Sequence, residues 1–217
     1  MSVIGVEGSF MKSQGFTGKV LAAIFIMIAV AAFKSSVSMG SDDVPKFVEY
    51  VSSGNYFKCS IPAEWSVYQQ VFGLSEEKKK VYGVTLFGPQ ENEVPVNPEI
   101  SIRYFAPGNL LHKTMDLFIR RNSGPALGLV LEGQSYGEVR EIEFAGRKAR
   151  VFERTDIRFI GKEAINMPKV SIFERFIIIP ASKDEGFYVL RLSVLAEIRE
   201  KYTGIFEETV KSFLPER

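Results

Sequence analysis

The stretch that decides the fold runs from Val170 to Leu195 and reads VSIFERFIIIP, ASKDEG and FYVLRLSVL. Apolar side chains fall on both parities of the first run, with Ile172, Phe176 and Ile178 on one and Phe173, Ile177 and Ile179 on the other. That pattern predicts a strand covered on both faces. The second run alternates around Arg191 and Ser193, which predicts a strand with only one face fully buried. Together the two runs predict a hairpin at the centre of a sheet.

Length and charge set broad limits on the chain. After a hydrophobic N-terminal segment, about 175 residues remain, enough for one domain that buries roughly 70% of its unfolded surface. The 27 basic and 26 acidic residues nearly balance, so the overall charge gives no reason to expect a nucleic-acid partner. The single cysteine excludes an intrachain disulfide.

The N-terminal segment has the pattern of an export signal. Lys12 and Lys19 precede the uninterrupted apolar run Val20–Phe33. As a helix, this run of about 14 residues rises only ~21 Å, which is short of the ~30 Å core of a bilayer. The pattern matches a secretory signal peptide, with cleavage expected near Ser38 or Gly40.

An uncleaved membrane anchor is the alternative, because Lys34 directly after the apolar run is unusual for a cleaved signal. Under either interpretation, residues 1–40 are the signal peptide or anchor and residues 41–217 form a single domain. The positive charges stay inside, so the domain is expected in the periplasm or on the extracytoplasmic side of the membrane.

Alternating residues predict further strands before the central hairpin. Phe47–Val51 and Tyr56–Ile61 should pair through the turn between them, with Cys59 as a small core residue. Two more strands are expected around Tyr82–Leu86 and Ile100–Tyr104. The loop Gly88–Pro98 between them is rich in proline, and we expect it to be exposed and to dock a partner.

Two helices are predicted from their apolar spacing. The first should follow Asn109 and continue to about Asn122, with Leu111 packing inward. His112 and Asp116 would then lie one turn apart, a spacing at which two side chains could hold a metal. We interpret them as a surface pair, since no third ligand is evident. The second helix should span Ile198–Leu214 and lie across the sheet.

A hairpin is predicted around Ala145–Gly146, because it would place Glu143 opposite Lys148 and Glu141 opposite Arg150. The charges would then neutralise each other, which makes this basic stretch a poor phosphate site. We expect a long connection to follow it from Thr155 to Met167.

The sequence GQSYG at Gly133–Gly137 has the spacing of a serine-hydrolase nucleophile elbow around Ser135. Such an elbow needs a helix directly after the serine and a histidine later in the chain, and neither is present. We therefore interpret the segment as a glycine-flanked turn.

The order of these features resembles the PsbP family. The resemblance covers roughly Phe47–Phe213 and rests on short motifs: the hairpin into IPAEW at Ile61–Trp65, the helix after the proline-rich loop, FAGRKA at Phe144–Ala149, GFYVL at Gly186–Leu190, and the closing helix with Lys211–Phe213.

The resemblance implies an α+β fold, with an antiparallel sheet flanked by helices in an α/β/α sandwich. It also implies a non-enzymatic role, because the chloroplast members are extrinsic subunits on the lumenal side of photosystem II that help to retain calcium and chloride. This chain differs by its bacterial-type export signal, so it is similar to a bacterial PsbP-like exported protein. The matching positions are packing and turn residues, and none is a functional residue.

No set of residues identifies a reaction, so we assign no catalytic, cofactor-binding or metal residue and expect no enzyme. We predict an exported binding or assembly factor that docks on a membrane-associated protein complex, with no cofactor. The membrane itself would be contacted only through the N-terminal segment, if that segment is uncleaved. The alternative is a carrier or sensor of a small or apolar ligand, held between sheet and helix in a cavity lined by residues such as Phe176 and Tyr188.

Overall fold

A computed structural model of the chain describes residues 45–68, 73–91, 96–126, 128–160, 169–182 and 186–216. Within these ranges most of the ordered backbone is β-strand. The strands are β1 Phe47–Val51, β2 Phe57–Pro62, β3 Ser66–Tyr68, β4 Val81–Phe87, β5 Glu99–Phe105, β6 Ser135–Tyr136, β7 Arg140–Phe144, β8 Arg147–Phe159, β9 Lys169–Pro180, β10 Phe187–Leu195 and β11 Leu214–Pro215. The α-helices are α1 Glu76–Lys79, α2 Met115–Asn122 and α3 Arg199–Lys211, the last preceded by a 3-10 turn, Ala196–Ile198.

The predicted central hairpin is confirmed. Among the described residues, an antiparallel sheet of eight strands has the order β3-β4-β5-β10-β9-β8-β6, with β7 also paired to β8. The strands β9 and β10 therefore lie in its middle. The prediction for β10 was wrong in one respect, because both of its faces are buried and Ser193 is only 3% exposed.

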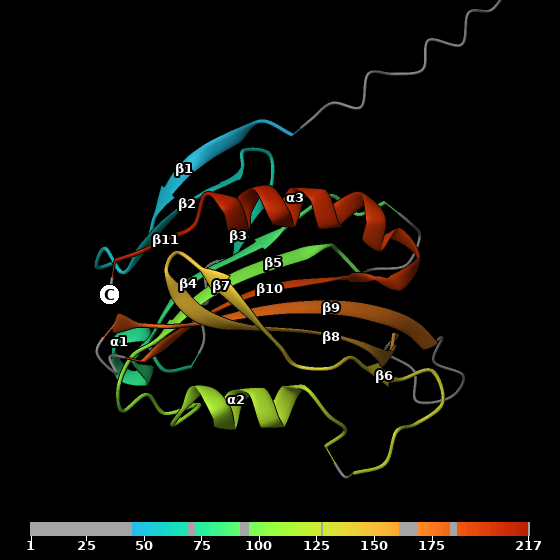
Figure 1. Cartoon of the computed structure of the whole chain (residues 1–217). Coiled ribbons are helices and arrows are strands. Elements are labelled where there is room, and N and C mark those ends of the chain that lie inside the picture. Colours follow the sequence, from blue (N-terminus) through green and yellow to red (C-terminus); the bar gives the residue numbers. More distant parts are fainter. Residues whose placement is uncertain are drawn as a thin grey trace, which may run out of the picture. The chain divides into compact units, whose positions relative to one another are not determined.

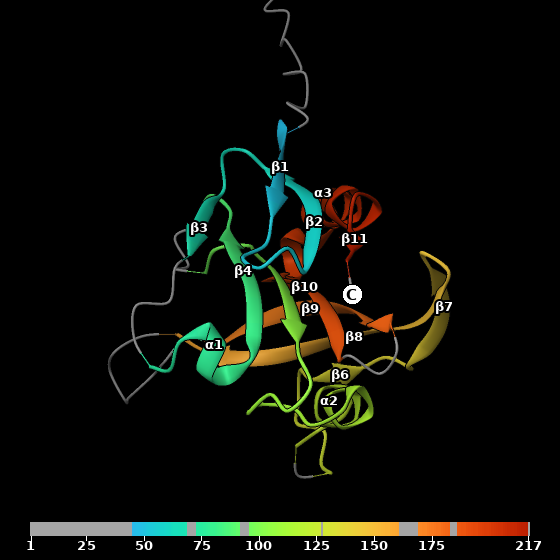
Figure 2. The same ribbon diagram turned by 90° about the vertical axis from the view of Figure 1, so that its left-hand side faces the viewer.

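The two faces of this sheet are covered differently. Figures 1 and 2 show α3 together with β1, β2 and β11 on one face, and α2 on the other. The strands β1, β2 and β11 form a small antiparallel sheet of their own. The protein thus has the predicted α+β fold of antiparallel sheets with a few helices, and these helices lie on both faces of the main sheet.

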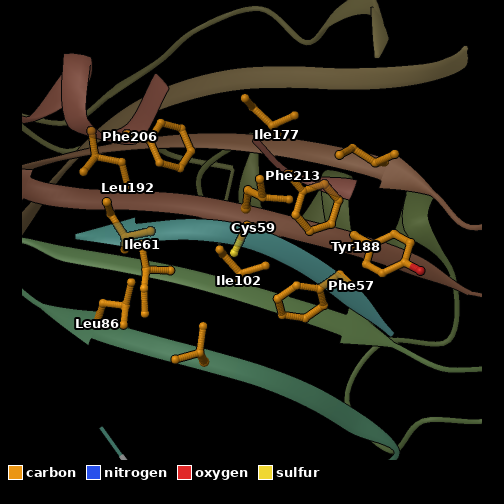
Figure 3. Packing of buried hydrophobic residues seen from close by; sticks show 14 of the residues in the cluster. Phe57, Cys59, Ile61, Leu86, Ile102, Ile177, Tyr188, Leu192, Phe206 and Phe213 are labelled. Atoms are coloured by element: carbon orange, nitrogen blue, oxygen red, sulfur yellow. The ribbon is translucent and has the colours of Figure 1, made fainter. Parts of the chain in front are cut away.

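The larger core lies between the main sheet and the layer that contains α3 and β2. Figure 3 shows Cys59 and Ile61 of β2 directed toward Ile102 and Leu192 of the main sheet. Burial raises the pKa of the Cys59 thiol to about 12, so the thiol stays protonated near neutral pH. This agrees with the predicted role of Cys59 as a small core residue.

The helix α2 begins later than predicted. The Asn109 side chain accepts hydrogen bonds from the backbone N–H groups of Leu111 and His112, and it donates to the carbonyl of His112. These bonds hold the segment in a loop, since a short amide side chain competes with helix formation. The helix starts only after Thr114, whose hydroxyl accepts from Leu117 N at 3.1 Å as an N-cap. Leu111 therefore does not pack inward and is exposed.

The charged hairpin has the predicted register. Glu143 lies opposite Lys148 and Glu141 opposite Arg150 in the β7–β8 pair. Ion pairs join Glu141 to both cations, at 3.3 Å for Lys148 and 2.7 Å for Arg150. Ala145 takes a φ of 49°, so the two-residue turn forms with a residue that rarely adopts this conformation.

Two predictions for the following segments were wrong. The expected connection from Thr155 begins instead as strand, because β8 continues to Phe159. The segment Gly133–Gly137 is not simply a turn, since Ser135 and Tyr136 form β6 and pair with Thr155 and Arg154 of β8.

The predicted signal or anchor, residues 1–40, lies outside the described residues. Among those that are described, no helix has the length and apolar character needed to cross a membrane.

The packing of α3 can be tested with a matched pair of substitutions. Phe206 is fully buried, so Phe206→Ala should lower the free energy of unfolding by about 3–5 kcal/mol. The same change at Phe159, which is 60% exposed, should alter the free energy of unfolding by no more than about 0.5 kcal/mol. Urea unfolding measures both, and equal effects would show that α3 does not pack on the sheet.

Candidate functional site: the arginine face

The helix α2 is too short to cover its face of the main sheet. Its 8 residues span only ~12 Å, whereas the 13 residues of β8 span ~43 Å. Phe118 and Ile119 of α2 bury the apolar part, where Phe176 and Phe187 lie. The helix ends at Asn122, whose carbonyl accepts from Arg154 Nη1 at 3.2 Å. Beyond this point the face is polar.

The strand register gathers the polar side chains. One row across the sheet runs from Phe87 to Glu99, Ser193, Glu174 and Arg154, and the next places Thr85 and Ser101 beside Arg191. Residues that are paired across neighbouring strands share a face, so these side chains lie together. We call this surface the arginine face and define it by nine residues: Thr85, Glu99, Ser101, Arg103, Arg154, Arg158, Glu174, Arg191 and Ser193.

The carboxylate of Glu174 is the centre of the arginine face. Its side chain is only 2% exposed, and Oε2 accepts from Arg154 Nε at 2.6 Å. Its Oε1 lies 3.5 Å from Arg158 Nη2 and 3.6 Å from Arg191 Nη1. A buried carboxylate requires such partners, because removing a charge from water costs several kcal/mol. Three arginines are thus oriented by one acid.

The arginine face extends from this centre toward β4. Arg191 also pairs with Glu99, and Arg103 Nη2 donates to Thr85 Oγ1 at 2.7 Å. Burial lowers the pKa of Arg103, and the positive charge of Arg191 lowers it further. The small hydroxyl residues Thr85, Ser101 and Ser193 are buried although they lie on a polar surface. The arginine side chains therefore act as the cover that α2 does not provide.

A hollow opens at one edge of the arginine face. It has a volume of about 410 Å³ and is lined by Phe87, Val96, Asn97, Glu99 and Arg158. The Arg158 side chain is 46% exposed, so its guanidinium can bind a partner while it remains close to Glu174. The hollow thus combines an apolar wall with one acid and one accessible cation.

The proline-rich loop forms part of this hollow. Gly88 N donates to Pro98 O at 2.8 Å, and Asn97 Nδ2 donates to Gly88 O at 2.9 Å. Glu91 is held by Lys201 and Tyr202 of α3. The described ends of the loop are therefore held in place. The predicted exposure is confirmed for Pro89–Glu91, whereas Gly88 and Pro98 are buried. Residues 92–95 lie outside the described part of the chain.

A second hollow, of about 360 Å³, lies between β1, β2 and the end of α3. Its polar groups already have partners, because Ser212 Oγ accepts from Ser60 N at 2.8 Å and Lys211 pairs with Glu208 at 2.5 Å. It is therefore a weaker candidate than the hollow beside the arginine face.

Phe176 and Tyr188, which the alternative prediction places in the wall of a ligand cavity, lie in packed regions. The Phe176 ring stacks on Phe152 with the ring centroids 4.6 Å apart. The Tyr188 ring contacts Tyr104 and Phe213, with centroid distances of 4.9 and 5.4 Å. Neither of the two hollows described above includes these two residues.

The predicted pair of His112 and Asp116 does not form on one helix. His112 precedes α2 and lies between the rings of Phe105 and Phe118, at centroid distances of 5.4 and 4.8 Å. Asp116 is exposed in the first turn of α2. Within the described ranges, no group of three or more histidine, cysteine or acidic side chains is placed to hold a metal.

Sequence reasoning missed the arginine face. Its signal was present, since Glu174 interrupts an apolar run and Arg191 lies within a strand that is otherwise apolar. A charge inside a central strand requires a buried partner. However, the partners come from β5 and β8, and only the three-dimensional register brings them together.

The buried ion-pair network predicts unequal effects for two similar substitutions. Glu174→Gln leaves three arginines without their shared acid. It should lower the free energy of unfolding by about 3 kcal/mol, the lower end of the range for a broken buried ion pair. Glu207→Gln also breaks a pair with an arginine, Arg175, but on the solvent-exposed face of α3, and should lower the free energy of unfolding by less than about 1 kcal/mol. Chemical denaturation measures the loss of stability in both variants. A loss for Glu174→Gln no larger than that for Glu207→Gln would contradict a stabilising ion-pair network around Glu174.

The environment of His112 predicts a pH-dependent stability. Burial lowers the pKa of His112 below its usual 6.5, and Arg121 lowers it further. The unfolded chain therefore binds a proton that the folded chain resists, so stability should fall as the pH drops through the window just below 6.5. His112→Phe removes the only histidine and should flatten the melting temperature between about pH 7.5 and 5.5 relative to the wild type. If the melting temperatures of the variant and the wild type changed with pH in the same way, His112 would not be the source of the pH dependence.

Comparisons with known proteins do not assign a family. No family model matches the chain, so the resemblance to the PsbP family is not confirmed, and no curated protein matches it either. Among solved structures, a Bacteroides thetaiotaomicron protein is similar, with a TM-score of 0.42 and 10% sequence identity. The similarity covers 78% of this chain and 48% of the Bacteroides protein, so this chain spans about half the length of that protein. LpqN of Mycobacterium tuberculosis, described as involved in cell envelope biogenesis, is similar with a TM-score of 0.39 and 11% identity over 79% of this chain and 91% of LpqN.

Proposed function

We propose that the protein is an exported, non-enzymatic binding factor that docks on a membrane-associated partner protein through the arginine face and its adjacent hollow. The single observation that carries this proposal is the ordered but accessible guanidinium of Arg158 at the rim of the hollow, beside Glu99. Arginine is enriched at protein interfaces, because its planar fork binds carboxylates in a fixed geometry and its stem packs on apolar groups.

The chemistry of the arginine face favours recognition over catalysis. Its charged groups are arginines and carboxylates held by ion pairs or, at Arg103, by a hydrogen bond to Thr85, and the candidate nucleophile Ser135 lies instead in β6, outside this set. A fixed set of charges lowers the entropic cost of binding, because the side chains are already held in place. A partner with an acidic side chain next to an apolar one would match Arg158 and Phe87.

The export proposal comes from the N-terminal pattern, in which Lys12 and Lys19 precede an apolar run. A domain delivered across the membrane by this segment meets membrane-associated proteins on the far side. The partner is therefore expected among such proteins.

The proposal can be tested by crosslinking in intact cells. Arg158→Ala should abolish or strongly reduce the crosslinked partner, because it removes the accessible cation and leaves Arg154 and Arg191 on Glu174. The matched control is Arg199→Ala, which removes an exposed arginine with an ion pair to Glu200 on α3. The control should retain the partner.

Both variants should melt within a few degrees of the wild type, because Arg199 pairs at the surface and Glu174 keeps Arg154 and Arg191 as partners when Arg158 is removed. Loss of the partner in both, or in neither, would refute the arginine face as the docking surface. Sequencing the N-terminus of the recovered chain also shows whether residues 1–40 are removed.

A further inference from the structure

Three consecutive aliphatic side chains are exposed to solvent between α2 and β6. Leu129, Val130 and Leu131 are 73%, 60% and 65% exposed. Single exposed apolar residues are common on proteins and need no explanation. Three in a row at this exposure form a contiguous patch, and such patches mark contact sites. We call Leu129–Leu131 the apolar tip.

The base of the apolar tip is held by hydrogen bonds. Leu131 N donates to Gln134 Oε1 at 3.0 Å, and Gln134 N donates to Leu131 O at 3.0 Å. Gln134 Nε2 also donates to Asp156 Oδ1 of β8 at 2.7 Å. The turn is thus anchored to the main sheet, and its aliphatic side chains are held in solvent.

The residues around the apolar tip indicate what covers it. The sequence from Asn122 to Leu131 contains no charged residue, and the tip side chains offer no hydrogen-bond donor or acceptor. Specific protein interfaces carry about one hydrogen bond per 100–200 Å². Contact with a bilayer surface instead needs aliphatic side chains with basic residues beside them. Along the sequence from Leu117 to Ser135, Arg120 and Arg121, both exposed in the last turn of α2, supply two positive charges and Glu132 one negative charge, while the Asp156 carboxylate at the base accepts a hydrogen bond from Gln134.

We propose that the apolar tip inserts into the surface of a bilayer that contains anionic phospholipids, while Arg120 and Arg121 bind lipid phosphates. The insertion is shallow, about 5–10 Å, as is usual for segments that lie in the interface. Arginine suits this position because its guanidinium binds phosphate oxygens in pairs. The inference goes beyond partner binding and does not depend on it, because the tip shares no residue with the arginine face.

A fluorescent label can test the insertion in the full chain. The background carries Cys59→Ala, which removes the only cysteine, and Val130→Cys receives an NBD label. In vesicles of phosphatidylglycerol and phosphatidylethanolamine, lipids brominated on their acyl chains should quench this label. A matched label at Leu214→Cys, another exposed apolar position, should stay unquenched. Because the N-terminal segment is present in both, it cannot account for the difference.

The role of the arginines has its own measurement. Changing Arg120 and Arg121 to glutamine should lower the equilibrium constant for insertion roughly thirtyfold, the factor expected for two basic residues at an anionic surface. Equal quenching in phosphatidylcholine vesicles would overturn this part of the proposal.

An unquenched label at residue 130 in anionic vesicles would overturn the proposal as a whole. Light scattering tests the alternative that the tip contacts a second copy of the chain. In that case the protein would form a dimer, and the dimer would disappear when Leu129, Val130 and Leu131 are all changed to serine. That triple variant should keep the parent melting temperature because the three side chains are exposed. Crosslinking through Arg158 is unaffected by either result, so the two proposals can fail separately.

Discussion

Both faces of the β9–β10 pair must be shielded from water, and the chain shields them by different means. On one face, β2 and α3 supply an apolar layer that packs on residues such as Leu192 and Ile177. On the other, α2 covers only the part around Phe176, and arginine side chains cover the remainder. This second cover depends on the buried carboxylate of Glu174, which orients three of the arginines. The architecture of the candidate site follows from that one acid.

An arginine cover has different properties from an apolar one. Burial of apolar surface contributes about 25 cal/mol per Å², whereas a buried ion-pair network is weak support for stability. A longer α2 over an apolar strand would therefore stabilise the fold more than Glu174 and its partners do. What the arginine cover offers instead is a polar surface that is already ordered. Arg154 is fixed on both Glu174 and the end of α2, so little side-chain entropy remains to be lost on binding.

The parts of the fold that follow from local periodicity were predictable. The β9–β10 pair and the register of Glu141 against Arg150 could both be inferred from neighbouring residues. The late start of α2 also had a local cause, the side chains of Asn109 and Thr114, but apolar spacing concealed it. The burial of Ser193 had no local signal, because part of its cover is Arg158, which is 35 residues away in sequence.

The same limit applies to the arginine face as a whole. Sequence alternation shows which residues of one strand share a face, but it does not show which strands are neighbours. Glu99 and Glu174 meet Arg191 only because β5 and β9 flank β10 on opposite sides. The sequence therefore shows that the central strands contain charges that need buried partners, whereas it does not show which residues those partners are.

The strand β8 joins the two proposed contact surfaces. On one face it carries Arg154 and Arg158, and between them Asp156 accepts the hydrogen bond from Gln134 that holds the base of the apolar tip. Gln134 reaches the tip directly through Leu131 N. A chain of two hydrogen bonds therefore connects the tip to the strand that bears the accessible cation. If the tip enters a bilayer, this connection keeps Arg158 near the membrane surface, where a membrane-associated partner would present its own acidic groups.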